Sequence, residues 1–494
     1  MFRRFSMSTK IRILALLLAA MMLASAGCGA GTESTDTSET AGTAEMAETA
    51  AATELTVELP SKTYNGEEVM FLTSKCTWSD KYTCFEIFAS EMNGALINDA
   101  VYTRNAQIEE LLDIRITETL LPDIHEVARE TLIAGDTQFD VVMPYINKGI
   151  GLATEGLLMD LNTIPYLALE KPWWDQRANE NLVISDKLFF TTGDISILDN
   201  ECTMVMFFNK DMIVQYNLDN PYTLVNEHTW TIDKVGEMSS LVTTDTNGDG
   251  KMNEDDTWGL SVAYNAPISL YFGAGERIVV DDGDGGLAFS IGSARSYDVI
   301  DKVMNLCYDP LMLSKHTVPK TDFTLAASMF NAGQLLFVTF ALSDITDLRE
   351  AEFEFGILPY PLYDESQKEY NNLISTILVG STSVPFNNTN AELTGAALEA
   401  MAYYSTKTLT PAYYDNALKT RYVRDEESGE MMDIIFATRV YDLGFIYDWG
   451  GAGSWVSNVY EGKSTEYVSG WESIKQKAQT ALDEALVNFA ALGS

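Results

Sequence analysis

The pattern of apolar and polar positions predicts alternating strands and helices in the first part of the chain. Residues 69–73 form an apolar run typical of a buried strand. A stretch with apolar residues at helical spacing follows it, at Ile97, Ala100, Val101, Ile108, Leu111 and Leu112. A strand at 114–118, a helix at about 123–134 and a strand at 139–143 complete the series. This order is typical of a parallel sheet with right-handed crossovers, so the first domain is predicted to be α/β.

The predicted sheet also indicates where a ligand would bind. Ligands of such sheets lie beyond the carboxyl ends of the strands, which selects the loops after Thr73 and after Met143. These two loops contain Trp78 with Asp80, and Tyr145 with Asn147, respectively.

The rest of the chain shows the same mixture of strands and helices and no internal repeat. Strands are predicted at 204–208, 258–263, 334–341 and 374–379, and helices at 232–242, through Val299 to Met304, and near 391–404. Prolines make 355–361 an extended crossing segment. The clearest helix is the last, with one apolar stripe formed by Ile474, Ala478, Ala481, Leu482, Ala485, Leu486 and Phe489.

The first 27 residues have the pattern of a secretory signal peptide. Basic residues precede an apolar run at 13–22, and small residues follow that run up to Cys28. The run is shorter than the roughly 20 residues that a membrane-spanning helix needs. Residues 28–59 are predicted to be a disordered tether, because up to about Thr53 they include no aromatic and no basic residue.

The segment Leu-Ala-Ser-Ala-Gly-Cys at 23–28 resembles the bacterial lipoprotein box. That resemblance implies cleavage before Cys28 and a lipid on its side chain, which would anchor the protein to the outer face of a cell membrane. A protein held by such a tether and a lipid anchor suits the surface of a Gram-positive cell better than a periplasm. The alternative is a plain cleavage site that happens to precede a cysteine.

Charge and cysteine content narrow the possible partners. The net charge is -40, and removal of four basic residues with the signal peptide makes it -44. Such a chain repels nucleic acid and anionic lipid headgroups. The exported location permits disulfides, and Cys76 with Cys84 is the nearest pair; buried free thiols are the alternative for these two, Cys202 and Cys307.

Six short motifs, in order, carry a resemblance to a known family. They are Phe-Asp-Val-Val at 139–142, Gly-Leu-Leu-Met-Asp-Leu at 156–161, Phe-Phe-Asn-Lys-Asp-Met at 207–212, Phe-Asn-Ala-Gly-Gln at 330–334, Phe-Gly-Ile-Leu-Pro at 355–359 ahead of Pro361, and an alanine-rich helix after Pro385. With the lipoprotein box, the chain resembles the extracellular solute-binding proteins of ABC importers (family 1), in the sugar-binding branch. It departs from them at Phe208, where the family usually has Tyr, and in its greater length, so the particular ligand stays open.

The resemblance implies the type II periplasmic-binding-protein-like fold, with two α/β lobes and the ligand in the cleft between them. Lobe 1 would comprise 60–190 and 360–405, and lobe 2 would comprise 194–357 and 410–494. Gly193, at the first crossing between the lobes, would be either a hinge residue or an ordinary turn glycine. The implied partners are a carbohydrate and the ABC permease subunits that receive it, and the protein is expected to be a monomer.

Residues 245–256 have the spacing of a calcium-binding loop. The predicted ligand positions are Asp245, Asn247, Asp249, Lys251, Asn253 and Asp256, and Gly250 stands where the loop needs a sharp turn. Asp256 replaces the usual Glu, which predicts a weak site with a dissociation constant on the order of 10⁻⁴ to 10⁻³ M. Trp258 opens a strand where an EF-hand would continue as helix, so the prediction is a structural Ca²⁺ rather than a switch. A solvated acidic turn is the alternative.

Aromatic residues in predicted loops are the second candidate site. Sugar rings pack their C–H faces on aromatic side chains, while their hydroxyl groups need polar partners. By position, the predicted ligand contacts are Trp78, Tyr145, Asp199, Tyr271, Phe340 and Trp455, each with core packing as its alternative. The pair Trp173 and Trp174 follows a proline, which favours packing over ligand binding.

Motifs of the common enzyme classes are missing from the sequence. It has no Gly-x-Ser-x-Gly elbow, no Walker loop and no His-Glu-x-x-His zinc helix. We therefore expect no enzymatic activity. The alternatives are the same fold with a peptide or other polar solute as cargo, a lipoprotein glycoside hydrolase, or a surface sensor without a transporter.

Overall fold

The computed structural model describes residues 56–263, 265–283, 286–416, 426–462 and 465–492. By its internal contacts the chain divides into Met1–Glu58 and Leu59–Ser494, and every element below belongs to the second unit. The predicted signal peptide, Cys28 and nearly all of the predicted tether lie outside the described residues. Among the helices that the structure describes, none has the length and apolar character that crossing a membrane requires.

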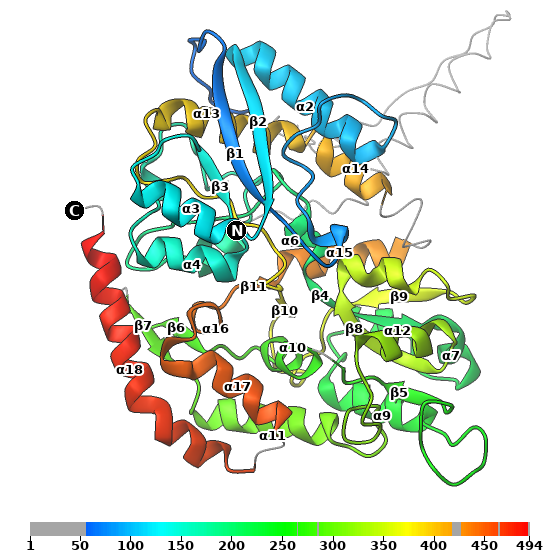
Figure 1. Ribbon diagram of the computed structural model, residues 1–494. Helices are drawn as coiled ribbons and strands as arrows, with labels where there is room; N and C mark the ends of the chain where they lie inside the picture. The colour runs from blue at the N-terminus through cyan, green and yellow to red at the C-terminus, as the bar shows by residue number, and fades with distance from the viewer. Residues whose placement is uncertain (1–55, 264, 284–285, 417–425, 463–464, 493–494) are drawn as a thin grey trace, which may run out of the picture. The chain divides into compact units, whose positions relative to one another are not determined.

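The first sheet has three parallel strands, which confirms the α/β arrangement predicted for this part of the chain (Figure 1). Val69 and Phe71 in its central strand are fully buried, as the apolar run predicts. The strands are β1 (Glu67–Lys75) in the centre, flanked by β2 (Ile114–Pro122) and β3 (Val141–Met143), and the connecting helices are α2 (Leu96–Leu112) and α3 (Ile124–Ile133).

A later segment of the chain returns to this sheet. Ser383 pairs with Val142 of β3, and Thr382 pairs with Thr191, both in antiparallel bridges. Helix α13 (Ala391–Ser405), which confirms the predicted helix near 391–404, then contacts α2 and β1. Residues far apart in sequence therefore surround one sheet, as a lobe built from two segments requires. The predicted boundaries of the two lobes stay a prediction.

The predicted strand at 374–379 is wrong. Only β10 (Asn372–Leu373) and a bridge at Ile374 are extended, and residues 376–378 form a turn. The amides of Leu378 and Val379 both donate to the carbonyl of Ser375, at 3.0 and 3.1 Å. The apolar residues of this run are mostly buried, but their burial is achieved by a turn packed between other segments, and hydrophobicity alone does not distinguish a turn from a strand.

The second sheet has four strands in the order β5-β8-β4-β9 (Figure 1). Its central strands β8 and β4 are antiparallel and buried along their whole lengths. β5 ends at Leu260, three residues before the predicted end at Ala263. The strands are β4 (Met204–Asn209), β5 (Trp258–Leu260), β8 (Leu335–Ala341) and β9 (Phe355–Leu358), and the covering helices include α9 (Ile232–Val242) and α12 (Phe323–Asn331).

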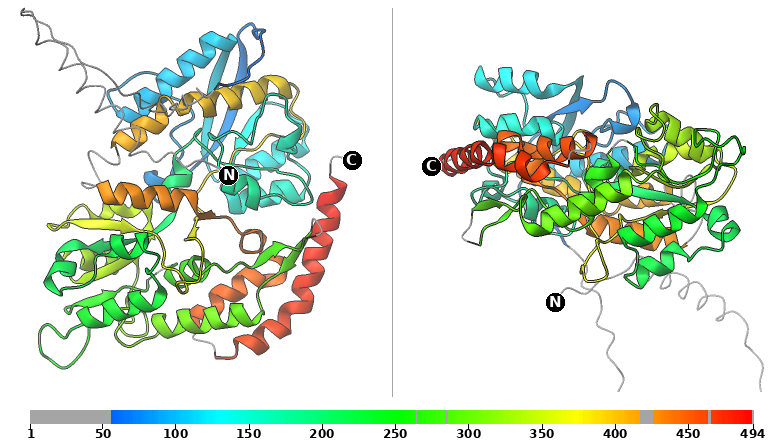
Figure 2. Two further views of the ribbon diagram at one scale, coloured as in Figure 1. Left: turned by 180° about the vertical axis from the view of Figure 1, so that it is seen from behind. Right: turned by 90° about the horizontal axis from the view of Figure 1, so that it is seen from below.

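The C-terminal helix α18 (Tyr467–Ala491) connects distant segments of the chain (Figures 1 and 2). Its predicted stripe is confirmed, because Ala478, Leu482 and Phe489 are buried. At its C-terminal end, the Lys187 ammonium donates to the carbonyls of Phe489 and Ala490, at 2.8 and 3.0 Å. A cation at this end also complements the partial negative charge of the helix terminus.

Trp173 and Trp174 are packing residues, as their position after a proline predicts. Both indole N–H groups donate to the Glu399 carboxylate, at 3.1 and 2.9 Å, and both rings are buried. A side chain on Gly193 would approach the Trp173 carbonyl to 2.5 Å, and the φ of Gly193 is not positive. Close packing against this tryptophan pair therefore requires glycine at position 193, and a hinge at this residue stays a prediction.

The four described cysteines, Cys76, Cys84, Cys202 and Cys307, are buried free thiols. Cys76 and Cys84 are thus free thiols, which was the alternative to a disulfide between them. The Cys84 thiol lies 3.4 Å from the Glu86 carboxylate and 3.5 Å from the Ser196 hydroxyl, and its one S–H can donate to either. Burial and then the nearby Glu86 raise the pKa of Cys84, so it stays protonated and unreactive at neutral pH.

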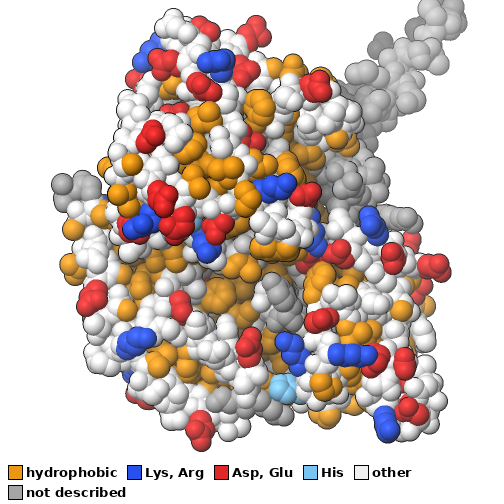
Figure 3. All heavy atoms as spheres, viewed as in Figure 1, with side chains coloured by type: hydrophobic (Ala, Val, Ile, Leu, Met, Phe, Trp, Pro, Cys, Tyr) orange, Lys and Arg blue, Asp and Glu red, His pale blue; other side chains and the backbone are white. Residues whose placement is uncertain are grey.

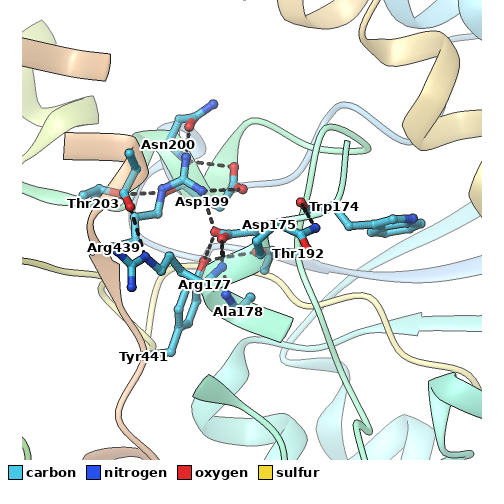
Figure 4. A network of polar contacts seen from close by, with 12 residues as sticks. Trp174, Asp175, Arg177, Ala178, Thr192, Asp199, Asn200, Thr203, Arg439 and Tyr441 are labelled. Carbon is cyan, nitrogen blue, oxygen red and sulfur yellow. Dashed lines mark hydrogen bonds and ion pairs between the residues drawn. The ribbon is translucent and has the colours of Figure 1, made fainter. Parts of the chain in front are cut away.

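Arg439 joins three segments of the chain through a buried ion-pair network (Figure 4). Its Nη1 lies 2.6 Å from Asp175 Oδ2 and 3.1 Å from Asp199 Oδ2. Tyr441 also donates to Asp175 Oδ2, at 2.8 Å. Burial alone would lower the pKa of Arg439, but Asp199 and Asp175 outweigh that effect and raise it. The guanidinium is therefore permanently charged and fixes β11 (Arg439–Val440) against the segments before and after Gly193.

Asp194 lies beside this network and adds a further carboxylate. It lines a cavity of about 300 Å³ together with Asp175, Asp199 and Arg439. Burial and the neighbouring Asp199 raise the pKa of Asp194 to about 7. Asp175 and Asp199 pair directly with the Arg439 guanidinium, whereas Asp194 has no ion pair with it, so the negative charge of Asp194 is the least stabilised of the three.

We expect Asp194→Asn to change the pH dependence of stability. In the unfolded chain Asp194 ionises near pH 4, whereas the folded protein retains its proton up to about pH 7. Asp194 therefore destabilises the fold increasingly as the pH rises from about 4 to about 7. The variant should be more stable than the wild type by on the order of 1 kcal/mol at about pH 8, and this difference should shrink at about pH 5.

Thermal or urea unfolding of both proteins at the two pH values measures this effect. Glu118, whose pKa burial raises to about 7, is present in both proteins and cancels in the difference. An equal stability difference at both pH values would contradict the assignment.

Candidate ligand-binding cleft

The loops that follow β1 and β3 meet at the carboxyl edge of the first sheet. Tyr145, directly after Pro144 at the end of β3, donates its hydroxyl to the carbonyl of Tyr82 at 3.3 Å. Tyr82 belongs to the loop after β1, where a short 3-10 helix spans Asp80–Tyr82. The two loops that the strand order selects as candidates therefore lie together.

A cavity of about 300 Å³ lies next to this contact, and we call it the cleft. It is lined from both sheets, because β1 contributes the loop that follows it, and β4 and β8 contribute their buried ends. α12 and the 3-10 helix η3 (Leu342–Leu348) complete the walls. The lining residues are Trp78, Ser79, Lys81, Tyr82, Met204, Phe323, Ala341, Asp344, Asp347 and Leu378.

Lys81 crosses the cleft and pairs with two carboxylates. Its Nζ lies 2.6 Å from Asp344 Oδ1 and 2.5 Å from Asp347 Oδ2. The same ammonium lies 5.0 Å from the ring centre of Tyr82 and 5.4 Å from that of Phe323, within cation–π range. Burial alone would lower the pKa of Lys81, but Asp344 and then Asp347 outweigh that effect and raise it. Lys81 is therefore charged and ties the loop after β1 to the segment after β8.

Trp78 is the exposed aromatic residue of the cleft. Its side chain is 65% exposed, whereas Trp173, Trp174, Trp230, Trp258 and Trp471 are almost completely buried. All eight tryptophans of the chain lie in the described ranges, and Trp78 is the only exposed one. A large aromatic face kept in solvent next to a donor and an acceptor suits a ring-shaped ligand that carries hydroxyl groups.

The structure brings only Trp78 of the predicted ligand contacts to the lining of the cleft. Tyr145 and Phe340 lie behind its walls, with Phe340 packed 4.5 Å from the ring of Phe323. Tyr271 is fully buried and its hydroxyl lies 3.1 Å from that of Ser296. Trp455 packs 5.6 Å from the ring of Trp471, and Asp199 belongs to the Arg439 network. The role of these residues in ligand binding stays a prediction.

The polar residues of the cleft are those that the sequence analysis missed. Lys81 and Tyr82 share the loop of Trp78, and Asp344 and Asp347 follow β8 directly. The rule that selected the loops after β1 and β3 could therefore also have selected the segment after β8. Phe323 gives no such signal, because it begins a helix and reaches the cleft only through the tertiary fold.

The predicted calcium loop has the expected turns, and its side chains bond to its own backbone. Gly250 has a φ of +78°, as the sharp turn requires. The Asp245 carboxylate accepts from the amides of Gly248 and Gly250, both at 2.8 Å, and buried Asp256 accepts from those of Thr246 and Asn253. Asn247, Asp249 and Asn253 likewise accept from amides of the loop through their side-chain oxygens. The carbonyl of Lys251 accepts from the side-chain amide of Asn253, at 3.4 Å.

Across the described part of the chain, no three His, Cys, Asp or Glu side chains are grouped to hold a metal ion. The calcium site therefore stays a prediction.

Comparisons with known proteins give a structural likeness without a sequence match. Neither a protein-family profile nor a curated protein sequence matches the chain. A cyclo/maltodextrin-binding protein in complex with maltotetraose is similar at a TM-score of 0.55 and 13% identity, over 87% of this chain and 98% of that one. The acarbose-binding GacH receptor of Streptomyces glaucescens gives 0.51 and 13%, over 86% and 99%.

The maltose/maltodextrin-binding domain MalE of Bdellovibrio bacteriovorus, bound to maltotriose, is similar at a TM-score of 0.50 and 16% identity. This match covers 84% of the present chain and 99% of that domain. All three likenesses extend over most of the described residues, across both sheets. The chain therefore has the two-lobe, periplasmic-binding-protein-like α/β fold.

Proposed function

We propose that this protein binds a carbohydrate in the cleft between its two sheets. The observation that carries the proposal is exposed Trp78 beside the Lys81 and Asp347 pair, in a cavity lined from both sheets. The likeness in fold to proteins bound to maltotetraose, maltotriose and acarbose supports it.

The chemistry of the cleft suits a sugar ring. One face of a pyranose is apolar and can cover the Trp78 ring, which removes apolar surface of both partners from water. Lys81 offers N–H donors and Asp347 offers acceptor oxygens next to each other, so that neighbouring hydroxyl groups of a ring can bond to both.

Binding without turnover is the role that fits this arrangement. The solved structures that share the fold are described as binding proteins or a receptor. A ligand that contacts both the loop after β1 and the segment after β8 favours the conformation in which the two are close together. It does so only to the extent that it binds this closed conformation more tightly than an open one. No covalent step is part of the proposal.

The surface charge argues against nucleic acid as a partner. On the face shown in Figure 3, Lys and Arg side chains are interspersed with Asp and Glu. The chain has 32 basic and 72 acidic residues, and a nucleic-acid site needs a basic patch or stripe.

Calorimetry of the protein from residue 54 onward against a panel of mono- and oligosaccharides tests the proposal. We expect saturable binding without hydrolysis, and about a five- to thirtyfold loss of affinity in Trp78→Ala, since stacking on an aromatic side chain contributes about 1–2 kcal/mol. Phe386→Ala is the matched control, because Phe386 is also an exposed aromatic residue, at 48%, and does not line the cleft. A folded protein that binds none of the sugars would refute the proposal.

We also propose that the protein is lipid-anchored through Cys28 and passes its sugar to an ABC permease. The lipoprotein-box resemblance at 23–28 supports the anchor, and the resemblance to importer-binding proteins supports the permease. Cys28→Ser should release the protein from the membrane fraction and reduce uptake of labelled sugar by cells, while the purified variant binds sugar as before. Unchanged membrane retention of the variant would contradict the anchor.

A further proposal is that residues 245–256 hold a structural Ca²⁺. The ligand spacing and the positive φ of Gly248 and Gly250 support it. Millimolar Ca²⁺ should raise the unfolding temperature of the wild type and of Asp255→Asn, because Asp255 is not at a predicted ligand position. Asp245→Asn, which keeps an acceptor oxygen but loses the charge, should lose most of that increase. An unfolding temperature that does not respond to Ca²⁺ would refute the site.

A further inference from the structure

The charged groups that line the cleft carry more negative than positive charge. They are Lys81, Asp344 and Asp347, and the other lining side chains are uncharged. The chain as a whole has the same sign, with a net charge of -40. A ligand that carries a carboxylate would bring a further negative charge into this small space, so the cleft opposes acidic sugars.

The two carboxylates differ in what they can offer a ligand. Asp344 is buried, and its Oδ1 already accepts from Tyr82 and Lys81. Its Oδ2 accepts from the Ala341 amide at 3.1 Å. The Asp347 side chain is 41% exposed, and in the described part of the chain its carboxylate bonds only to Lys81, through Oδ2. The Oδ1 atom of Asp347 is therefore the anionic acceptor that the cleft leaves available.

The aromatic side chains of the cleft also favour a cation. The Lys81 ammonium already lies within cation–π range of Tyr82 and Phe323. Tryptophan attracts a cation more strongly than either of these residue types, and Trp78 lines the same cavity with its side chain 65% exposed. A positively charged group on a ligand would thus meet an acceptor oxygen and an electron-rich ring in one cavity.

We infer that the cleft selects sugars by charge and prefers an amino sugar, whose ammonium group bonds to Asp347, over the neutral sugar and the sugar acid of the same shape. This inference rests on the proposed carbohydrate function. The neutral sugar still covers Trp78 and bonds to Lys81, so it binds more weakly rather than not at all. Lys81 does not reverse the preference in favour of the sugar acid, because two carboxylates already share its charge.

Calorimetry at about pH 6 and low salt with glucosamine, N-acetylglucosamine, glucose and glucuronate tests the inference, each as the single sugar and as the β-linked disaccharide. We expect glucosamine to bind about fivefold or more tightly than the two neutral sugars, and glucuronate to bind most weakly. This preference should shrink in about 0.5 M NaCl, because salt screens a partly exposed ion pair. Glucosamine binding no tighter than glucose, or glucuronate binding tighter than glucose, would overturn the inference.

Two variants assign the preference to one carboxylate. Asp347→Asn keeps an acceptor oxygen and loses the charge, so the affinities for glucosamine and glucose should come to lie within about twofold of each other. Asp80→Asn is the matched control, because Asp80 is an exposed acid in the same 3-10 helix as Lys81 and does not line the cleft. It should keep the preference for glucosamine. Equal loss of the preference in both variants would assign it to the general charge of the protein and overturn the role of Asp347.

Failure of this inference is distinguishable from failure of the proposed function. If these sugars are silent while others of the wider panel bind, the charge selection is overturned and the carbohydrate function stands. If the wider panel is silent as well, both fall.

Discussion

The cleft depends on the ion pair and hydrogen bonds that the buried carboxylate of Asp344 accepts. A carboxylate removed from water is costly unless donors surround it. Here the Tyr82 hydroxyl, the Lys81 ammonium and the Ala341 amide all bond to it. Two of these donors come from the loop after β1, and the third comes from β8 itself. Because leaving any of these groups unpaired is costly, the carboxylate keeps the edges of the two sheets together beside the cleft.

The same arrangement, one cation between two carboxylates, recurs at the junction around Arg439. In a chain with 72 acidic and 32 basic residues, most carboxylates must remain in solvent, and a buried one needs donors around it. At Glu399 the donors are two indole N–H groups, whereas at these two junctions they include a cation. Lys81 serves Asp344 and Asp347, and Arg439 serves Asp175 and Asp199. At both places the pKa of the cation is raised because its carboxylate partners outweigh the effect of burial. Ion pairs thus join segments that are distant in sequence. Continuous apolar packing at the same places would fill the cavities that these ion pairs line.

Local patterns predicted the elements of this fold well, and long-range contacts account for what they missed. Apolar spacing gave β1, α2 and α18, and the rule on strand ends gave the loop of Trp78. It could not give the partner of Lys81, because 263 residues separate Lys81 from Asp344 in sequence (344 minus 81). Phe340 was predicted to face a ligand, but β8 is buried on both faces, so neither face of that strand is available. At 374–379 the hydrophobic run correctly indicates burial, but the strand predicted from it is wrong, because the backbone turns at 376–378.

Burial separates the tryptophans that build the core from Trp78, the one tryptophan that is exposed. Trp173 and Trp174 are fixed because Glu399 accepts from both of their indoles, and an aromatic-rich sequence needs such partners to bury polar N–H groups. Trp78 has no comparable burial, and its exposed apolar face is surface that the fold could have covered. Removing that face from water contributes about 25 cal/mol for each Å² covered, a gain that remains unrealised until a ligand lies on it. The proposed ligand site therefore depends on this one exposed tryptophan, which lines a cavity whose buried carboxylate, Asp344, is already satisfied by hydrogen bonds.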